Sequence, residues 1–272
     1  MCTALRRRLM TALLSALALV AFPAITSANH SWGNYHWART SNPFTLKLGD
    51  NVSSAWDEYL SEASGDWSQS VVLDTTVVPG GTRPKLCRAT LGRVEVCNAK
   101  YGNNGWLGLA QIWVSGSHIA QGVTKVNDTY FTTSKYNTPA WRRFVMCQEI
   151  GHTFGLDHQD EIFSNGNLGT CMDYTSDPDG PPSNEHPDYH DYDQLEAIYV
   201  HTDNTTTVGQ TAQNGKMPPA MTEIDFAGPG QWGKLVRSTH GGLNELYELD
   251  FGGGHKVFTF VIWAKGEARG QN

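Results

Sequence analysis

The most chemically informative part of the chain is the segment Cys147-Gln-Glu-Ile-Gly-His-Thr-Phe-Gly-Leu-Asp-His158. On a helix, residues four positions apart lie one turn above each other, so Gln148 and His152 can face a common ion. Glu149 is offset by about 100° of rotation and would flank that ion. The spacing therefore predicts a metal site with a carboxylate beside it.

The second half of the segment can complete this site. Gly155 can end the helix in the left-handed conformation, which lets the chain reverse and bring His158 back as a third ligand. Zinc held by three protein ligands keeps a fourth position for water and lowers the pKa of that water toward about 7. A neighbouring carboxylate can take the proton as water attacks a carbonyl and then deliver it to the leaving amine, and Glu149 is placed for this role.

These residues resemble the metzincin metalloproteases, especially the compact matrixin-like members, whose pattern is His-Glu-x-x-His-x-x-Gly-x-x-His followed by a Met-turn. The chain matches the pattern at Glu149, His152, Gly155 and His158, and Cys171-Met-Asp-Tyr174 follows at the interval of a Met-turn. The resemblance covers roughly residues 45–202 and is specific only between 147 and 174.

The resemblance implies a zinc-dependent endopeptidase that acts on a protein or peptide. Met172 would lie beneath the metal-binding imidazoles, and Tyr174 would reach the metal or support the oxyanion. The implied fold is α+β and zincin-like, a twisted mixed β-sheet with an active-site helix and a Met-turn. In this fold Gly108-Leu-Ala110 would lie on an edge strand that pairs with an extended substrate by β-strand addition.

The chain departs from the pattern at the first ligand, which is Gln148 instead of histidine. A neutral amide oxygen is a poorer donor to zinc than an imidazole nitrogen. Three interpretations follow: Gln148 is a weak ligand, another histidine such as His186 or His190 takes its place, or the site holds little metal. In the third case the protein would be a pseudoprotease, a secreted binding or inhibitory module without turnover.

Apolar periodicity and turn residues predict the elements that position the site. The segment 29–50 shows little periodicity, and we expect it to wrap the surface as an arm. Thr138-Pro139 should open the helix that carries the motif, and Asp191 is a candidate cap for the last helix. The predicted helices span 52–67, 139–154 and 191–201, and the predicted strands span 70–78, 93–97, 106–114, 119–127, 234–238, 245–250 and 257–263.

The sequence predicts a secreted protein, and the resemblance implies that its main part is a catalytic domain followed by a small appendage. Three arginines, an apolar stretch of 14 residues and Thr26-Ser-Ala28 make residues 1–28 a signal peptide, and no other segment is apolar enough for a membrane span. Its removal takes three positive charges and changes the net charge from −7 to −10, so we expect no nucleic-acid partner. Residues 29–201 would form the metzincin-like domain, 202–231 a linker, and 232–272 a β-rich C-terminal appendage.

Four cysteines remain after the signal peptide, which predicts two disulfides in an oxidising compartment. Proximity favours Cys87–Cys97 and Cys147–Cys171 among the three possible pairings. Two acidic groups could bind a structural Ca²⁺, although they are more typical of solvated loops: Asp157, Asp160 and Glu161, and Asp177-Pro-Asp179. His118, His240 and His255 lie beside turn glycines and receive no predicted role.

Overall fold

The computed structural model describes residues 30–162, 165–212, 217–223, 226, 228–239 and 242–265. The predicted signal peptide lies outside these residues. Within the described ranges, no helix is both long enough and apolar enough to cross a bilayer. The helices are α1 (Asp57–Trp67), α2 (Asp128–Phe131), α3 (Pro139–His152), α4 (Tyr189–Ile198) and α5 (Pro219–Glu223), with a short 3₁₀ turn at Pro229–Gln231.

A single mixed sheet runs through the molecule in the order β3-β2-β4-β6-β5-β9-β8-β7, with β1 pairing on β6. The strands from β3 to β6 are parallel to one another, whereas β5, β9, β8 and β7 follow in antiparallel pairs. The strands are β1 (His36–Trp37), β2 (Phe44–Asn51), β3 (Leu73–Pro79), β4 (Val94–Ala99), β5 (Trp106–Ser115), β6 (His118–Asn127), β7 (Lys234–Thr239), β8 (Asn244–Asp250) and β9 (His255–Trp263).

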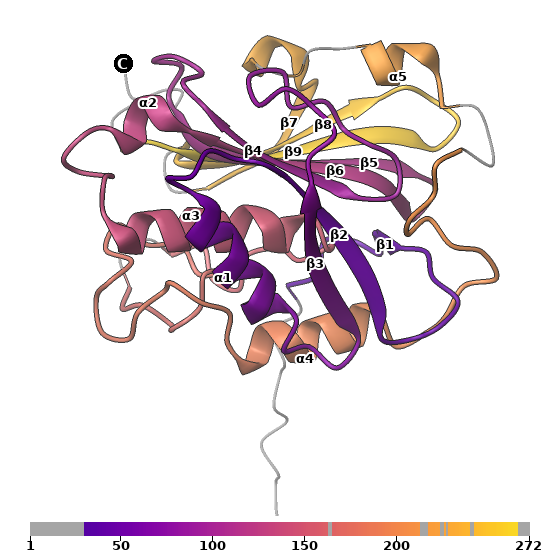
Figure 1. Ribbon diagram of the computed structural model, residues 1–272, viewed down its shortest axis with the longest axis horizontal. Helices are drawn as coiled ribbons and strands as arrows, with labels where there is room; N and C mark the ends of the chain where they lie inside the picture. The colour runs from indigo at the N-terminus through magenta and orange to yellow at the C-terminus, as the bar shows by residue number, and fades with distance from the viewer. Residues whose placement is uncertain are drawn as a thin grey trace, which may run out of the picture.

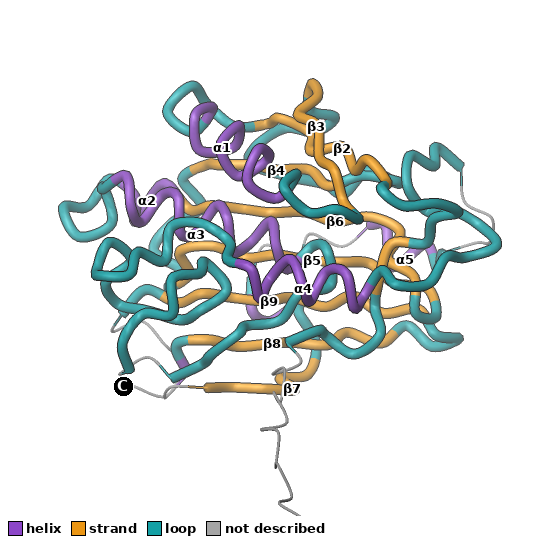
Figure 2. The backbone as a smooth tube through the Cα atoms, turned by 90° about the horizontal axis from the view of Figure 1, so that it is seen from below, coloured by secondary structure: helices purple, strands orange, loops and turns teal. Residues whose placement is uncertain are grey.

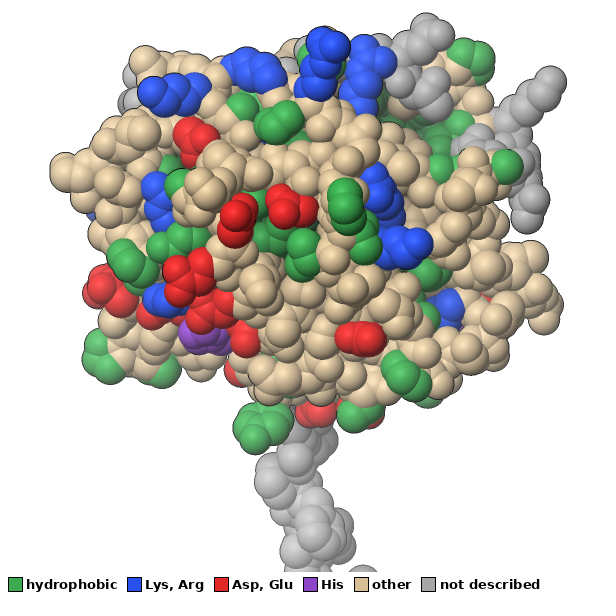
Figure 3. Space-filling model, viewed as in Figure 1, with side chains coloured by type: hydrophobic (Ala, Val, Ile, Leu, Met, Phe, Trp, Pro, Cys, Tyr) green, Lys and Arg blue, Asp and Glu red, His purple; other side chains and the backbone are tan. Residues whose placement is uncertain are grey.

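Two layers result. The helices α1, α3 and α4 lie on one face of the sheet, and α5 lies on the other (Figure 1). Seen from below, α3 and α4 lie in front of the central strands, and β9, β8 and β7 continue the sheet beyond β5 (Figure 2). On the face viewed in Figure 3, basic side chains gather toward the upper edge and acidic ones toward the lower left.

The main difference from the sequence prediction lies in residues 29–50. Instead of a surface arm, Phe44–Asn51 forms β2, which has β3 on one side and β4 on the other. Phe44, Leu46 and Leu48 are buried, whereas the intervening Thr45 and Lys47 are exposed. This is the two-residue alternation of a half-buried strand, and it is visible in the sequence.

The C-terminal segment also differs from the prediction. It does not form a separate appendage, because β9 pairs with β5 from Trp106–Trp263 to Ser115–His255 and thereby joins β7 and β8 to the main sheet. The sequence boundaries of these three strands agree with the structure to within two residues. Part of the expected linker is ordered as α5, and Trp113 on β5 donates a hydrogen bond to the Met221 carbonyl there.

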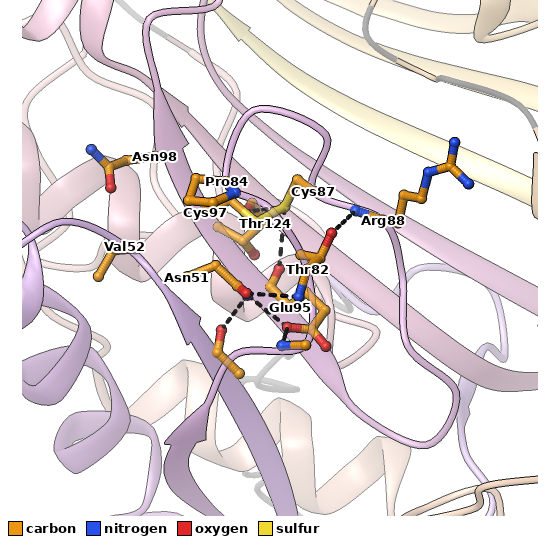
Figure 4. The surroundings of a disulfide bond; sticks show 12 residues. Asn51, Val52, Thr82, Pro84, Cys87, Arg88, Glu95, Cys97, Asn98 and Thr124 are labelled. Carbon is orange, nitrogen blue, oxygen red and sulfur yellow. Dashed lines mark hydrogen bonds between the residues drawn. A yellow bond between two sulfur atoms is a disulfide. The ribbon is translucent and has the colours of Figure 1, made fainter.

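Both disulfides join the cysteines that proximity favours, Cys87 with Cys97 and Cys147 with Cys171. Figure 4 shows the first, which ties the loop before β4 to that strand. Beside it, the buried Glu95 carboxylate accepts hydrogen bonds from Arg93, Asn51 and the Gly81 amide. A buried charge needs such partners, and together they hold this loop against β2 and β4.

Candidate metal centre

The helix α3 carries the motif, and its start follows from local sequence. Thr138 caps it through a 3.2 Å hydrogen bond from the Trp141 amide, and Pro139 occupies the first turn, as the sequence predicts. The helix ends at His152, and Gly155 adopts a φ of 99°, which favours glycine. A side-chain carbon on Gly155 would lie 2.4 Å from the Tyr35 carbonyl oxygen, so this reversal requires glycine on both counts.

The two motif histidines face each other. The Nε2 atoms of His152 and His158 are 3.1 Å apart, and both rings are buried. Two nitrogen ligands of a tetrahedral zinc ion, each about 2.0–2.1 Å from it, lie roughly 3.3 Å apart. The Nδ1 of His152 lies 2.9 Å from the Leu156 carbonyl, to which it can donate, and this leaves the Nε2 lone pair directed at His158.

Gln148 and Glu149, on the same helix as His152, carry unsatisfied oxygens. Gln148 donates its amide hydrogen to the Cys171 carbonyl at 2.7 Å, while its Oε1 is buried without a hydrogen-bond partner. Both carboxylate oxygens of Glu149 are also buried without a partner. Buried polar atoms without partners are uncommon in native proteins, and a cation bound beside these oxygens would satisfy them. The residues therefore fit a metal ion.

Burial controls the protonation of the same groups. It raises the pKa of Glu149 well above that of an exposed carboxyl group, because the charged form loses its hydration. Burial, together with the neighbouring His158, lowers the pKa of His152, which keeps its imidazole neutral and able to bind a metal.

A glycine on β5 allows Glu149 to approach the sheet. A side-chain carbon on Gly108 would lie 2.6 Å from Val145 Cγ1 and 2.8 Å from Glu149 Oε1. The lack of a side chain at Gly108 therefore sets how closely α3 packs on β5, and with it the position of the carboxylate.

Met172 lies below the end of α3, in a turn that follows the Cys147–Cys171 disulfide. A side-chain carbon on Gly151 would lie 2.7 Å from the Met172 sulfur, so the methionine packs tightly under the last turn of the helix. The disulfide joins this turn to α3 one residue before Gln148. These contacts fix the helix end from which His152 projects.

Neither histidine suggested as a replacement ligand lies at the site. The Nδ1 of His186 is 2.8 Å from Asp66 Oδ2, and His190 stacks on His30 with ring centroids 4.8 Å apart. Gln148 therefore remains the candidate for the first ligand position.

The strand predicted to bind substrate is not an edge in this structure. Gly108, Leu109 and Ala110 pair with β6 on one side and with Ile262, Val261 and Phe260 of β9 on the other, respectively. The prediction of a free edge is wrong, because β9 of the C-terminal segment pairs with the side of β5 that does not face β6.

Side chains of the C-terminal segment also cover the histidines. The Phe260 ring stacks on His152 with centroids 4.2 Å apart and planes 5° from parallel. The Asn244 amide nitrogen lies 2.9 Å from Nδ1 of His158. Tyr174 donates its hydroxyl hydrogen to the Leu243 carbonyl at 2.7 Å, so this hydroxyl is occupied by the same segment.

Two acidic residues, one inside the motif and one just after it, pair with an arginine of β7. Arg237 forms ion pairs with both carboxylate oxygens of Asp157 and lies 3.2 Å from Glu161. A guanidinium group therefore already neutralises these two carboxylates, which argues against Ca²⁺ at this position. Asn244, Phe260 and Arg237 had no signal in the sequence, because each contacts the motif only through the pairing of β9 with β5.

No family model matches the chain, and no curated protein matches it. Among solved structures the chain is similar to high choriolytic enzyme 1, a hatching enzyme zinc-protease from the medaka fish Oryzias latipes. The two are 9% identical, and the match covers 61% of this chain and 94% of that chain with a TM-score of 0.31. A likeness this weak does not bear on function, which rests on the geometry described above.

Proposed function

We propose that this protein is a secreted zinc-dependent endopeptidase, with Gln148, His152 and His158 as the metal ligands. The observation that carries the proposal is the convergence of the two imidazole Nε2 atoms, 3.1 Å apart, together with the buried carboxylate and amide oxygens of Glu149 and Gln148 that have no hydrogen-bond partner. Zinc at this position would polarise the substrate carbonyl and activate water. The secretory location is supported by the two disulfides and by the expected signal peptide.

Glu149 is the residue proposed to move the proton. Its pKa is raised by burial, the direction expected of a group that must both accept and return a proton near neutral pH. Gly108 holds the carboxylate close to β5, the strand along which the peptide would bind once its far side is free. Tyr174 is a candidate to support the oxyanion after its hydroxyl is released from the Leu243 carbonyl.

We further propose that the described structure is a latent state. A peptide cannot pair with β5 while β9 occupies that side, and the Phe260 ring covers His152. Substrate binding therefore requires that the segment from β7 to β9 be displaced or removed. The exposed residues Asn204–Thr206 and Thr211–Ala212, which precede this segment, offer a place where a protease could cut.

The test of latency is Phe260→Ala, which removes the ring from His152 and also removes buried packing that holds β9 on β5, so that β9 is displaced more easily. Phe258→Ala is the matched control, because Phe258 lies on the same strand and, like Phe260, contacts Trp32, but its other ring contact is Tyr35 and not His152. With zinc added, Phe260→Ala should digest casein at least ten-fold faster than the wild type or the control, and a chelator should abolish the difference. Asn244→Ser serves as a milder second variant. Equal rates in all four proteins would contradict latency.

Catalysis itself is tested by adding Glu149→Gln to the Phe260→Ala protein. Loss of the proton-transferring group should lower the rate by roughly 10²–10⁴-fold, while zinc content measured by mass spectrometry should stay unchanged. An undiminished rate would remove Glu149 from the mechanism.

The second candidate function is a secreted binding or inhibitory module without turnover. Gln148 in the ligand set, the pairing of β9 with β5 and the Phe260 ring over His152 favour it. In that case the Phe260→Ala variant would bind zinc or a peptide but would not cleave casein. A latent enzyme would cleave it.

A further inference from the structure

A second group of metal-binding side chains lies outside the site on α3. His36 on β1, His118 at the start of β6, and His201 and Asp203 after α4 come from three separate parts of the chain. Asp203 Oδ1 is 3.5, 3.3 and 3.8 Å from the Nε2 atoms of His36, His118 and His201, respectively. The Nε2 atoms of His36 and His201 are 3.2 Å apart.

The neighbours of this group orient its ligand atoms. The Nδ1 of His36 lies 2.7 Å from the Asn34 carbonyl, to which it can donate, so its Nε2 lone pair faces the group. Asp203 Oδ2 accepts hydrogen bonds from the backbone amide of Arg39 at 3.2 Å and from its guanidinium group at 2.9 Å. Oδ1 is left to face the three rings. A fixed tautomer and a fixed carboxylate are the features that support a metal site.

The chemistry of the group selects the ion. Up to three imidazole nitrogens and one carboxylate oxygen are a ligand set that suits Zn²⁺, which is usually bound by four ligands in a tetrahedron. The edges of such a tetrahedron are about 3.3 Å for bonds of about 2.0–2.1 Å. Among His36, His201 and Asp203 the distances between ligand atoms are 3.2 to 3.8 Å, close to this value, so side-chain shifts of a few tenths of an ångström would suffice for these three ligands. His118 approaches only the Asp203 carboxylate this closely, at 3.3 Å, so its side chain would have to turn further to reach the same ion.

An ion could enter this group from solvent. His36 and His201 line a cavity of about 210 Å³, and the side chains of His118 and His201 are 34% and 48% exposed. His36 is buried, so one side of the group lies in the protein interior and the other side is accessible to solvent.

We propose that His36, His201 and Asp203 bind a structural zinc ion, with His118 as the fourth ligand. The ion would tie β1 and the segment after α4 to the β5–β6 turn. It needs no role in peptide hydrolysis, so this proposal stands independently of the function proposed for the site on α3.

The experiment measures zinc in the full secreted chain after purification without chelator. If both sites bind zinc, the wild type holds two ions per chain, and His201→Ala and His118→Gln each lower this number to about one. His186→Ala is the matched control, since His186 is similarly exposed (46%) but pairs with Asp66, and it should keep both ions.

Thermal unfolding gives a second readout. Excess zinc should raise the Tm of an Asp203→Asn variant by less than it raises that of the wild type, with a difference of roughly 5–10 °C for a site filled at about 100 times its Kd. If the site on α3 binds no zinc, the wild type holds one ion and His201→Ala holds none. Zinc content equal to the wild type in both His201→Ala and His118→Gln would overturn the second site.

Discussion

Gln148 and Glu149 are neighbours in the chain, but they differ in how many of their buried polar atoms lack a hydrogen-bond partner. Gln148 keeps one half of its amide hydrogen-bonded to the Cys171 carbonyl and leaves the oxygen without a partner. Glu149 leaves its whole carboxylate without a partner in a fully buried position. Both arrangements cost stability in the absence of a ligand. Unpartnered buried oxygens at two adjacent residues therefore point to a ligand-binding site.

Replacing Gln148 with histidine should tighten zinc binding by about ten-fold or more, because an imidazole nitrogen is a better donor to zinc than an amide oxygen. Competition with a coloured zinc chelator measures this change. Gln148→Ala is the companion variant and should weaken binding. If both variants keep the wild-type affinity, residue 148 is not a ligand.

Asp191 should make stability depend on pH. It is fully buried, Thr170 and the Asp188 amide donate to one of its oxygens, and burial raises its pKa to about 7. The pKa in the folded state then lies above the value of about 4 in the unfolded chain. Its stabilising contribution is complete below about pH 4 and is lost as the pH rises through 7.

Urea unfolding at several pH values measures this contribution. Relative to Asp191→Asn, the wild type should lose up to about 1.4 kcal/mol of unfolding free energy per pH unit between pH 4 and 7. Parallel curves for the two proteins would show that Asp191 does not titrate in this range.

Among the helices and strands, those with strong local signals agree well with the sequence prediction. The cap and the first turn of α3 are as expected, because Thr138 and Pro139 act on their immediate neighbours. The predicted cap of α4 is wrong by three residues: Asp188 caps the helix, and Asp191 closes a capping box from inside it. β2 was missed although Phe44, Leu46 and Leu48 alternate, because the aromatic and polar residues around it obscured the pattern.

Gly108→Ala tests how β5 and α3 fit together. The added carbon would meet Val145 and Glu149, so we expect a loss of about 1–3 kcal/mol in unfolding free energy from overpacking. In the Phe260→Ala protein, it should also displace the Glu149 carboxylate and reduce the hydrolysis rate. Urea unfolding and the casein assay report the two effects separately.

Gly65→Ala is the control for this substitution. Gly65 lies within α1, and a side-chain carbon there meets nothing within 4 Å. Alanine should stabilise that helix by about 0.5–1 kcal/mol. A stable Gly108→Ala protein with an unchanged rate would mean that this contact does not position Glu149.

Local sequence carries much less information about which strands are neighbours in the sheet. The strands of the C-terminal segment were predicted, but their partner was not, because Gly108 pairs with Ile262 more than 150 positions away. Periodicity within a strand reports which face is buried and does not report its neighbour. For the same reason the motif indicates candidate metal ligands, whereas the contacts of Phe260 and Asn244 with them and the His36–His201–Asp203 group are apparent only in three dimensions.

The strand β9, which pairs with β5, belongs to the same chain as β5, and this affects how a free peptide can compete with it. β9 is held near β5 by a covalent tether, so its local concentration is fixed by the length of that tether and does not change when the protein is diluted. A peptide free in solution must compete with this fixed local concentration of β9. Dilution of the protein therefore does not help the peptide to displace β9. Lasting release of β9 from β5 would then depend on cleavage of the chain that joins them. Such cleavage happens once, and dilution does not reverse it.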